Sequence, residues 1–212
     1  MNWSSKWSTF IESISNENFQ QLIKTGLINT LLIAVLGLLI GIVIGTLIAI
    51  VKVTPKYKLY VRILNKICTV YVAIFRGTPM VVQLLLAYYV FIPTIGLKGV
   101  DPVTVRIIVS GLNSGAYVSE IMRGGINSID PGQLEAGRAL GLKYSTTMFR
   151  IVIPQAIKNI LPTIGNEFIT LIKETSVVSF ITVADLYNAF YNISLSTHDT
   201  IIAYLAMAVI YL

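Results

Sequence analysis

Charged residues are scarce in this chain. They make up 12% of its 212 residues, whereas a soluble domain averages about 25%. Hydrophobic residues make up 55%, and the mean hydropathy is +0.76. Residues 26–51 contain no charge at all. A helix of that length, at about 1.5 Å per residue, crosses a hydrocarbon core of about 30 Å. This stretch is too long and begins too late for a signal peptide. The composition therefore predicts a membrane protein.

Groups that enzymes use for chemistry are also rare. Cys68 is the only cysteine, which excludes an internal disulfide and favours a structural thiol. His198 is the only histidine, and it lacks partners for a metal site or a nucleophilic relay. Residues 137–143 lack the spacing and the adjacent Gly-Lys of a phosphate-binding loop. We therefore expect no catalytic residue and no metal site.

The net charge of +6 does not indicate nucleic acid, because the cations cluster at the ends of apolar stretches. One cluster follows the first apolar stretch without any acid, and the other surrounds a polar loop that contains Asp130 and Glu135. Lys and Arg favour cytoplasmic loops, so both segments are predicted to lie inside and the N-terminus outside. The clusters are Lys52, Lys56, Lys58, Arg62 and Lys66, and Arg123, Arg138, Lys143, Arg150 and Lys158.

The apolar pattern predicts an all-α integral membrane protein with five transmembrane helices and the C-terminus inside. Thr78-Pro79 interrupts the second span, because proline removes a backbone donor and clashes with the preceding turn. A helix from residue 200 covers only about 20 Å by Leu212, so we expect the chain to continue. The predicted spans are 22–51, 57–91, 103–122, 151–172 and the segment from 200 onward.

Two features near the N-terminus have alternative readings. Residues 1–21 place Trp3, Trp7 and Phe10 at helical spacing, which predicts either an amphipathic helix on the outer membrane surface or a frayed tail. Glycines at positions 37, 41 and 45 share one face of the first span. They either allow a second helix to approach closely or are simply tolerated in a membrane helix.

The polar loop at about residues 128–153 is predicted to form two short helices that meet at a turn. Asp130-Pro131 suits the start of the first helix, with Gln133 as a capping-box partner. Gly141 is placed to end that helix in a left-handed conformation, and Ser145 to cap the second. A short, doubly capped helix is rigid and would transmit displacement by a partner to the adjoining spans. An ordinary cytoplasmic linker is the alternative.

The run Glu135-Ala136-Gly137-x3-Gly141-x9-Ile151-x-Ile153-Pro154 resembles the EAA signature of permease subunits of bacterial binding-protein-dependent ABC importers. That family usually has Ala at position 137 and Leu at position 153. Other stretches resemble its polar amino acid uptake subfamily. These are Phe75-Arg76-Gly77-Thr78-Pro79, Gly115-Ala116-Tyr117 with Glu120 and Arg123-Gly124-Gly125, Gly165-Asn166-Glu167-Phe168 and Lys173-Glu174-Thr175-Ser176.

The resemblance implies a type I ABC importer (MetI-like) transmembrane fold for residues 22–212. It implies two paired permease subunits, identical or paralogous, in the bacterial inner or plasma membrane. Two ABC ATPases would hold ATP and Mg, so we expect no cofactor in this chain. An external solute-binding protein would deliver an amino acid. The loop would dock on an ATPase as a coupling helix, and its candidate residues are Leu134, Glu135, Ala136, Gly137, Arg138 and Gly141.

Charges within predicted spans cost at least about 2.5–3.5 kcal/mol at the bilayer centre, so they face protein, water or each other. Asn166 and Glu167 would line a polar substrate pocket at a bend made by Pro162 and Gly165, or would form structural hydrogen bonds or ion pairs between helices.

Glu120 is expected to pair with Arg123 or another basic residue. Lys173-Glu174 is expected to form a mutual or interhelical salt bridge, with an outer gate or a contact with the substrate-delivering protein as the alternative. Thr78, Gln83 and Thr170 complete the candidate substrate set, and Arg76 and Asp185 complete the charges.

Acidic side chains in the pocket region favour a basic amino acid as the substrate. An ion-coupled secondary transporter or channel would also explain carboxylates within the membrane, but it gives no reason for the capped loop. A membrane-embedded enzyme is a third class, which the absence of a nucleophile–base pair disfavours.

Overall fold

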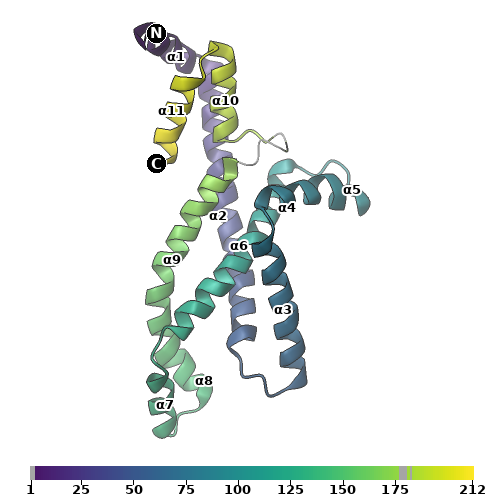
Figure 1. Cartoon of the computed structure of the whole chain (residues 1–212), viewed down its shortest axis with the longest axis vertical. Helices are drawn as coiled ribbons and strands as arrows, with labels where there is room; N and C mark the ends of the chain where they lie inside the picture. The colour runs from purple at the N-terminus through teal and green to yellow at the C-terminus, as the bar shows by residue number, and fades with distance from the viewer. Residues whose placement is uncertain (1–2, 177–180, 182) are drawn as a thin grey trace. The chain divides into compact units, whose positions relative to one another are not determined.

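A computed structural model describes residues 3–176, 181 and 183–212, and within this part the chain is built from helices without a strand (Figure 1). The predicted all-α fold is therefore confirmed. The elements are α1 (Trp3–Ser15), α2 (Glu17–Val53), α3 (Leu59–Gly77), α4 (Met80–Leu86), the π-helix η1 (Ala87–Phe91), α5 (Ile92–Thr94), α6 (Pro102–Asn127), α7 (Pro131–Ala139), α8 (Tyr144–Thr147), the π-helix η2 (Met148–Val152), α9 (Ile153–Glu174), α10 (Leu186–Thr197) and α11 (Thr200–Tyr211).

The helices form two compact units. Unit 1 comprises Met1–Leu36, Met80–Val109 and Leu171–Leu212, and unit 2 comprises Gly37–Pro79 and Ser110–Thr170. The long helices α2, α6 and α9 each contribute residues to both units.

In unit 1, helix α1 packs against α10 and α11 (Figure 1). Phe10 joins an apolar cluster with Phe190 and Ile202, and the Lys6 ammonium forms a salt bridge of 2.6 Å with the Asp199 carboxylate. The predicted N-terminal helix is thus present, although α1 ends at Ser15 rather than continuing through residue 21. Part of its apolar face covers protein, and its position at the membrane surface stays a prediction.

In unit 2, glycines bring α2 and α6 into close contact. An added Cβ on Gly41 would lie 2.7 Å from the Ser114 hydroxyl oxygen, and one on Gly45 would lie 2.6 Å from a Val118 methyl group. Such separations are too short for real carbon atoms, so only glycine fits. The prediction that these positions admit a second helix is confirmed, and small residues are what helix packing in a membrane requires.

Two glycines of α6 provide a matched stability test. An added Cβ on Gly111 would lie 2.5 Å from the Ile40 Cγ2 atom, whereas nothing lies within 4 Å of the corresponding position on Gly124. We expect Gly111→Ala to lower the free energy of unfolding by about 1–3 kcal/mol. Gly124→Ala should raise it by up to about 1 kcal/mol through helix propensity. Thermal unfolding in detergent measures both, and equal shifts would contradict this packing.

Two helix boundaries coincide with proline signals. Helix α2 ends at Val53, next to Thr54-Pro55, and Thr78 separates α3 from α4 in an extended conformation (φ −119°, ψ 142°). The predicted break at Thr78-Pro79 is therefore confirmed. At Pro162 and Gly165 the helix is not broken, because α9 runs from Ile153 to Glu174 with Pro162 inside; the predicted bend there stays a prediction. Neighbouring groups can compensate for the missing donor when a helix is packed among others.

Helix α2 is the one described helix that is long and apolar enough by itself to cross a membrane. The broken pair of α3 and residues 80–94 qualifies as a second crossing if it is counted as one span. Helix α11 is apolar but shorter, and α6 and α9 carry several polar and charged residues. The count of five spans and the orientation of the termini stay predictions.

Candidate functional site

The polar loop of unit 2 begins with a capped helix. The Asp130 Oδ1 atom accepts a hydrogen bond of 2.8 Å from the Gly132 amide, and Pro131 occupies the first helical position of α7. This start was predicted, and it satisfies an amide that would otherwise lack a partner. The Gln133 side chain lies beside Gln155, whose Nε2 atom is 3.5 Å from Gln133 Oε1, so the predicted capping box is wrong.

The end of α7 is fixed by a Schellman motif. Gly141 has a left-handed backbone with φ of +78°. Its amide donates to the Arg138 carbonyl at 2.9 Å, and the Leu142 amide donates to the Gly137 carbonyl at 3.1 Å. These two bonds satisfy the last carbonyl groups of the helix. The predicted role of Gly141 is confirmed, and α7 is capped at both ends.

The second helix of the loop differs from its prediction. Helix α8 starts after Lys143, whose side chain makes no capping bond, and it continues directly through η2 into α9. Ser145 is therefore inside the helix and the predicted cap is wrong. Thr147 is fully buried, and an added Cβ on Gly137 would lie 2.4 Å from its methyl carbon. This contact explains why glycine occupies position 137 and locks α7 onto α8.

We call residues 131–152, which form α7, α8 and η2, the knob. Among its candidate coupling residues, Glu135, Ala136 and Arg138 are exposed, Leu134 is half-buried, and Gly137 is buried. Two further apolar side chains face outward, with 81% of Leu140 and 69% of Phe149 exposed. Sequence reasoning missed these two residues, although apolar residues in an otherwise polar loop are a usable signal. Exposed apolar groups on a rigid surface are typical of a protein-binding site.

The base of the knob connects to the ends of α2 and α6. The Glu120 carboxylate contacts the Lys52 ammonium at 2.5 Å and the Arg123 guanidinium at 2.6 Å. The predicted pairing of Glu120 is therefore confirmed, with Lys52 as an additional partner. A cavity of about 420 Å³ lies beside these residues. Its lining is Lys52, Val53, Arg123, Ile126, Asn127, Ile129, Asp130, Pro131, Leu134, Tyr144, Met148 and Val152.

Three of the candidate substrate residues lie within two turns of α9 in unit 2. The Ser114 hydroxyl donates a hydrogen bond of 2.9 Å to Glu167 Oε1, and the Thr170 hydroxyl donates to the Asn166 carbonyl at 3.0 Å. Asn166 and Thr170 are exposed, and Glu167 is half-buried. A carboxylate oriented by a hydroxyl is suited to bind an ammonium or guanidinium group.

The remaining candidates lie on other elements. Thr78 is at the end of α3, and its hydroxyl donates to the Ile74 carbonyl at 2.8 Å. Gln83 is in α4, which belongs to unit 1. Arg76, one of the predicted intramembrane charges, lies over the Tyr117 ring with its guanidinium carbon 5.2 Å from the ring centroid. This cation–π contact gives Arg76 a structural role.

Arg106 of unit 1 was missed by sequence reasoning. It is fully buried, and its Nη2 atom donates to the Glu174 carbonyl at 2.7 Å. Its Nε and Nη1 atoms, and the Oδ2 atom of buried Asp185, have no hydrogen-bond partner among the described residues. Glu174 and Asp185 are the acidic residues whose negative charges attract the guanidinium group. The sequence did contain a signal for this residue, because Arg106 is a cation within the predicted span 103–122. A guanidinium with unused N–H groups is able to bind a carboxylate.

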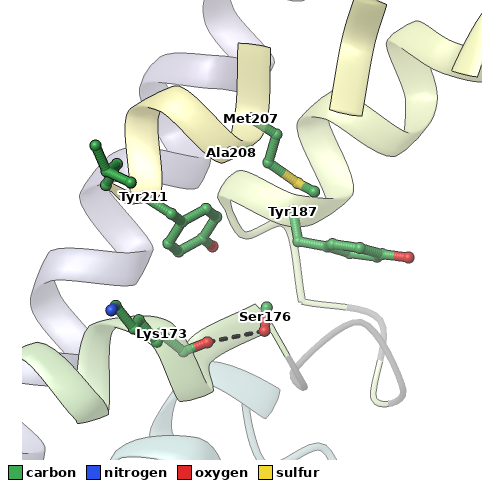
Figure 2. A pocket seen from close by; sticks show the side chains of 7 residues that line it. Lys173, Ser176, Tyr187, Met207, Ala208 and Tyr211 are labelled. Atoms are coloured by element: carbon green, nitrogen blue, oxygen red, sulfur yellow. Dashed lines mark hydrogen bonds between the residues drawn. The ribbon is translucent and has the colours of Figure 1, made fainter. Parts of the chain in front are cut away.

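Lys173 lines a second cavity, of about 550 Å³, in unit 1. Figure 2 shows Lys173, Tyr187 and Tyr211 among the residues that line this cavity. The Ser176 hydroxyl donates a hydrogen bond of 2.8 Å to the Lys173 carbonyl. In the described part of the chain neither Lys173 nor Glu174 forms an ion pair within 4 Å, so the predicted salt bridge is wrong. Consecutive helical residues point in different directions, which separates these two charges.

Comparison with known proteins identifies the family. Residues 41–212 match the family model of the binding-protein-dependent transport system inner membrane component. A putative glutamine transport system permease, GlnP of Rickettsia bellii, is 41% identical over 82% of this chain and 77% of that protein. The arginine transport system permease ArtQ of Bacillus subtilis is 38% identical over the same shares.

Solved structures agree with this assignment. The crystal structure of an amino acid ABC transporter with histidines matches with a TM-score of 0.82 at 39% identity, covering 92% of this chain and 87% of that one. A structure of the MetNI methionine ABC transporter, at 16% identity and a TM-score of 0.67, shares the fold. The MetI-like fold is confirmed, and the chain is a transport subunit rather than an enzyme. It belongs to the family of inner membrane components of binding-protein-dependent transport systems, as a permease subunit of an ABC importer for polar amino acids.

Proposed function

We propose that this permease imports a basic L-amino acid and that the knob is the coupling helix on which a separate ABC ATPase docks. The observation that supports the coupling role is the rigid, doubly capped α7 with outward-facing Glu135 and Leu140. A rigid element transmits a displacement, whereas a flexible linker would absorb it. Family membership supplies the expectation of an ATPase partner.

Within the permease, movement of the knob would reach the membrane helices by two routes. One route is covalent, because η2 continues into α9 without a break. The other passes through Glu120, which joins the end of α6 to Lys52 at the end of α2. In this proposal, ATP-driven closure of the ATPases displaces the knob. The displacement reaches α9, α6 and α2 together and exposes the substrate path to the outside.

For the substrate we propose that Glu167 binds a cationic group of the amino acid, with Asn166 and Thr170 as hydrogen-bonding neighbours on α9. Thr78 and Gln83 are proposed as further polar contacts along the path. A carboxylate suits the α-ammonium group of every amino acid and also the side chain of a basic one. The Ser114 hydrogen bond at 2.9 Å supports this role because it orients the carboxylate.

The complete transporter, in this proposal, lies in a bacterial cell membrane with several crossings per permease and the N-terminus outside. It pairs this chain with a second permease, two ATPases that hold ATP and Mg, and an external solute-binding protein. No cofactor is assigned to the permease itself.

Substrate-dependent ATP hydrolysis tests the substrate class. The purified complex with its solute-binding protein, in a lipid nanodisc, is offered arginine, lysine, histidine, glutamine, glutamate or cystine. We expect the three basic amino acids to stimulate ATP hydrolysis most. Equal or greater stimulation by glutamine or cystine would contradict basic specificity while leaving the coupling proposal standing.

A further inference from the structure

Helix α3 of unit 2 has three distinct faces. Val61 and Val72 are its buried residues, and Val72 packs with Ile48 and Ala116. Lys58 directly precedes the helix, and with Arg62 and Lys66 it continues one line at four-residue spacing, all three exposed. Residues four apart lie one above another on a helix. The three cations therefore form a stripe, which we call the basic stripe.

An apolar stripe runs beside the basic one. Leu59, Ile63 and Ile67 also recur at four-residue spacing, and their exposed fractions are 72%, 53% and 60%. Tyr57, at the turn before the helix, is 88% exposed. No acidic residue lies between Lys52 and Phe75. This side of α3 thus combines apolar side chains, an aromatic ring and uncompensated positive charge.

The position of the stripe along the chain places it at a membrane surface. The apolar part of α2 ends at Val51, one residue before Lys52, and the basic stripe begins six residues later. The turn that links the two helices is ordered, because the Arg62 Nε atom donates to the Lys56 carbonyl at 3.0 Å. A helix that leaves the hydrocarbon at Lys52 holds Lys58 and Arg62 near the lipid headgroups, where tyrosine also favours the interface.

We propose that the basic stripe and the adjacent apolar stripe form a docking surface for anionic phospholipids. The lipid phosphates lie along Lys58, Arg62 and Lys66, and the acyl chains cover Leu59, Ile63 and Ile67. Anionic lipids attract clusters of Lys and Arg next to a membrane span, and apolar side chains retain the chains of the same lipids. The surface selects headgroup charge rather than a particular lipid species.

Lipid retention by the purified permease–ATPase complex tests this surface. The probes are phosphatidylglycerol and phosphatidylcholine with identical acyl chains, and native mass spectrometry measures how many of each stay bound. We expect the wild type to prefer phosphatidylglycerol. The triple variant K58Q/R62Q/K66Q should lose that preference by about tenfold or more, since each cation near the surface contributes several-fold.

A matched control removes three exposed cations outside both the basic stripe and the knob, in the variant K24Q/K98Q/K158Q. It should keep the preference for phosphatidylglycerol. The proposal is overturned if the wild type shows no preference, if the stripe variant keeps it, or if the control loses it equally.

Spin labelling separates a lipid surface from a second protein that covers the same face. A nitroxide at Ile63→Cys, in a Cys68→Ala background, should collide readily with oxygen, which concentrates in lipid. Protection of this label from oxygen in the assembled transporter would show a protein contact there and would overturn the proposal. This readout needs no variant of the basic stripe.

Discussion

Replacing Gly141 with valine is expected to reduce amino acid uptake by about tenfold or more while ATP hydrolysis by the partner subunit continues. Gly141 has φ of +78°, a conformation that costs an ordinary L-residue about 1–2 kcal/mol and a β-branched one more. The strain would break the two hydrogen bonds that close α7. A loosened knob no longer transmits movement, so uptake per ATP hydrolysed should fall in proteoliposomes.

The matched control is Gly141→Asn, because asparagine tolerates the left-handed conformation. It should retain most of the uptake. A second coupling variant, Glu135→Lys, reverses an exposed charge on α7 without disturbing its caps. Wild-type coupling in Gly141→Val would show that the rigid end of α7 is not needed for transport.

Substitution of Glu167 with alanine is expected to have the other large effect. Loss of a hydrogen bond to a charged group costs about 1.5–3 kcal/mol, which corresponds to about a tenfold to hundredfold weaker apparent affinity. If the carboxylate binds the side chain of a basic substrate, arginine uptake should suffer more than glutamine uptake. Transport assays of both amino acids in the reconstituted complex measure this difference.

Two controls separate substrate binding from structural support. Glu167→Asp keeps the charge and should retain more uptake than Glu167→Gln, which keeps the shape. Ser114→Ala removes the hydroxyl that donates to Glu167 and should have a smaller effect than Glu167→Ala. If Glu167→Ala lowers protein stability but leaves the apparent affinity for arginine unchanged, the carboxylate serves helix packing alone.

Much of the fold could be predicted because its signals are local. Pro55 follows the end of α2 and Pro79 lies at the break between α3 and α4, as expected for a residue that lacks a backbone donor. Asp130-Pro131 and Gly141 cap α7 through bonds to backbone groups within a few residues. The glycine face of α2 also depended only on spacing. Each of these features follows from residues near one another in sequence.

Other features depended on contacts that the sequence does not show. Pro162 removes a backbone donor, yet α9 continues through it, since the effect of proline within a packed helix depends on its neighbours. Ser145 suited a cap, yet α8 starts at Tyr144 and Ser145 lies inside it. The buried guanidinium of Arg106 bonds to the carbonyl of Glu174, 68 residues away in the sequence. In such cases tertiary packing decides the outcome.

The most direct test of the coupling account is photo-cross-linking from the surface of the knob. A photoreactive amino acid at Leu140, which is 81% exposed, is introduced into the permease and the assembled transporter is irradiated. The account predicts a covalent product with the ATPase subunit from position 140, and none from the exposed control position Leu97. An ATPase product from position 97 alone, or none from either position in an active transporter, would contradict it.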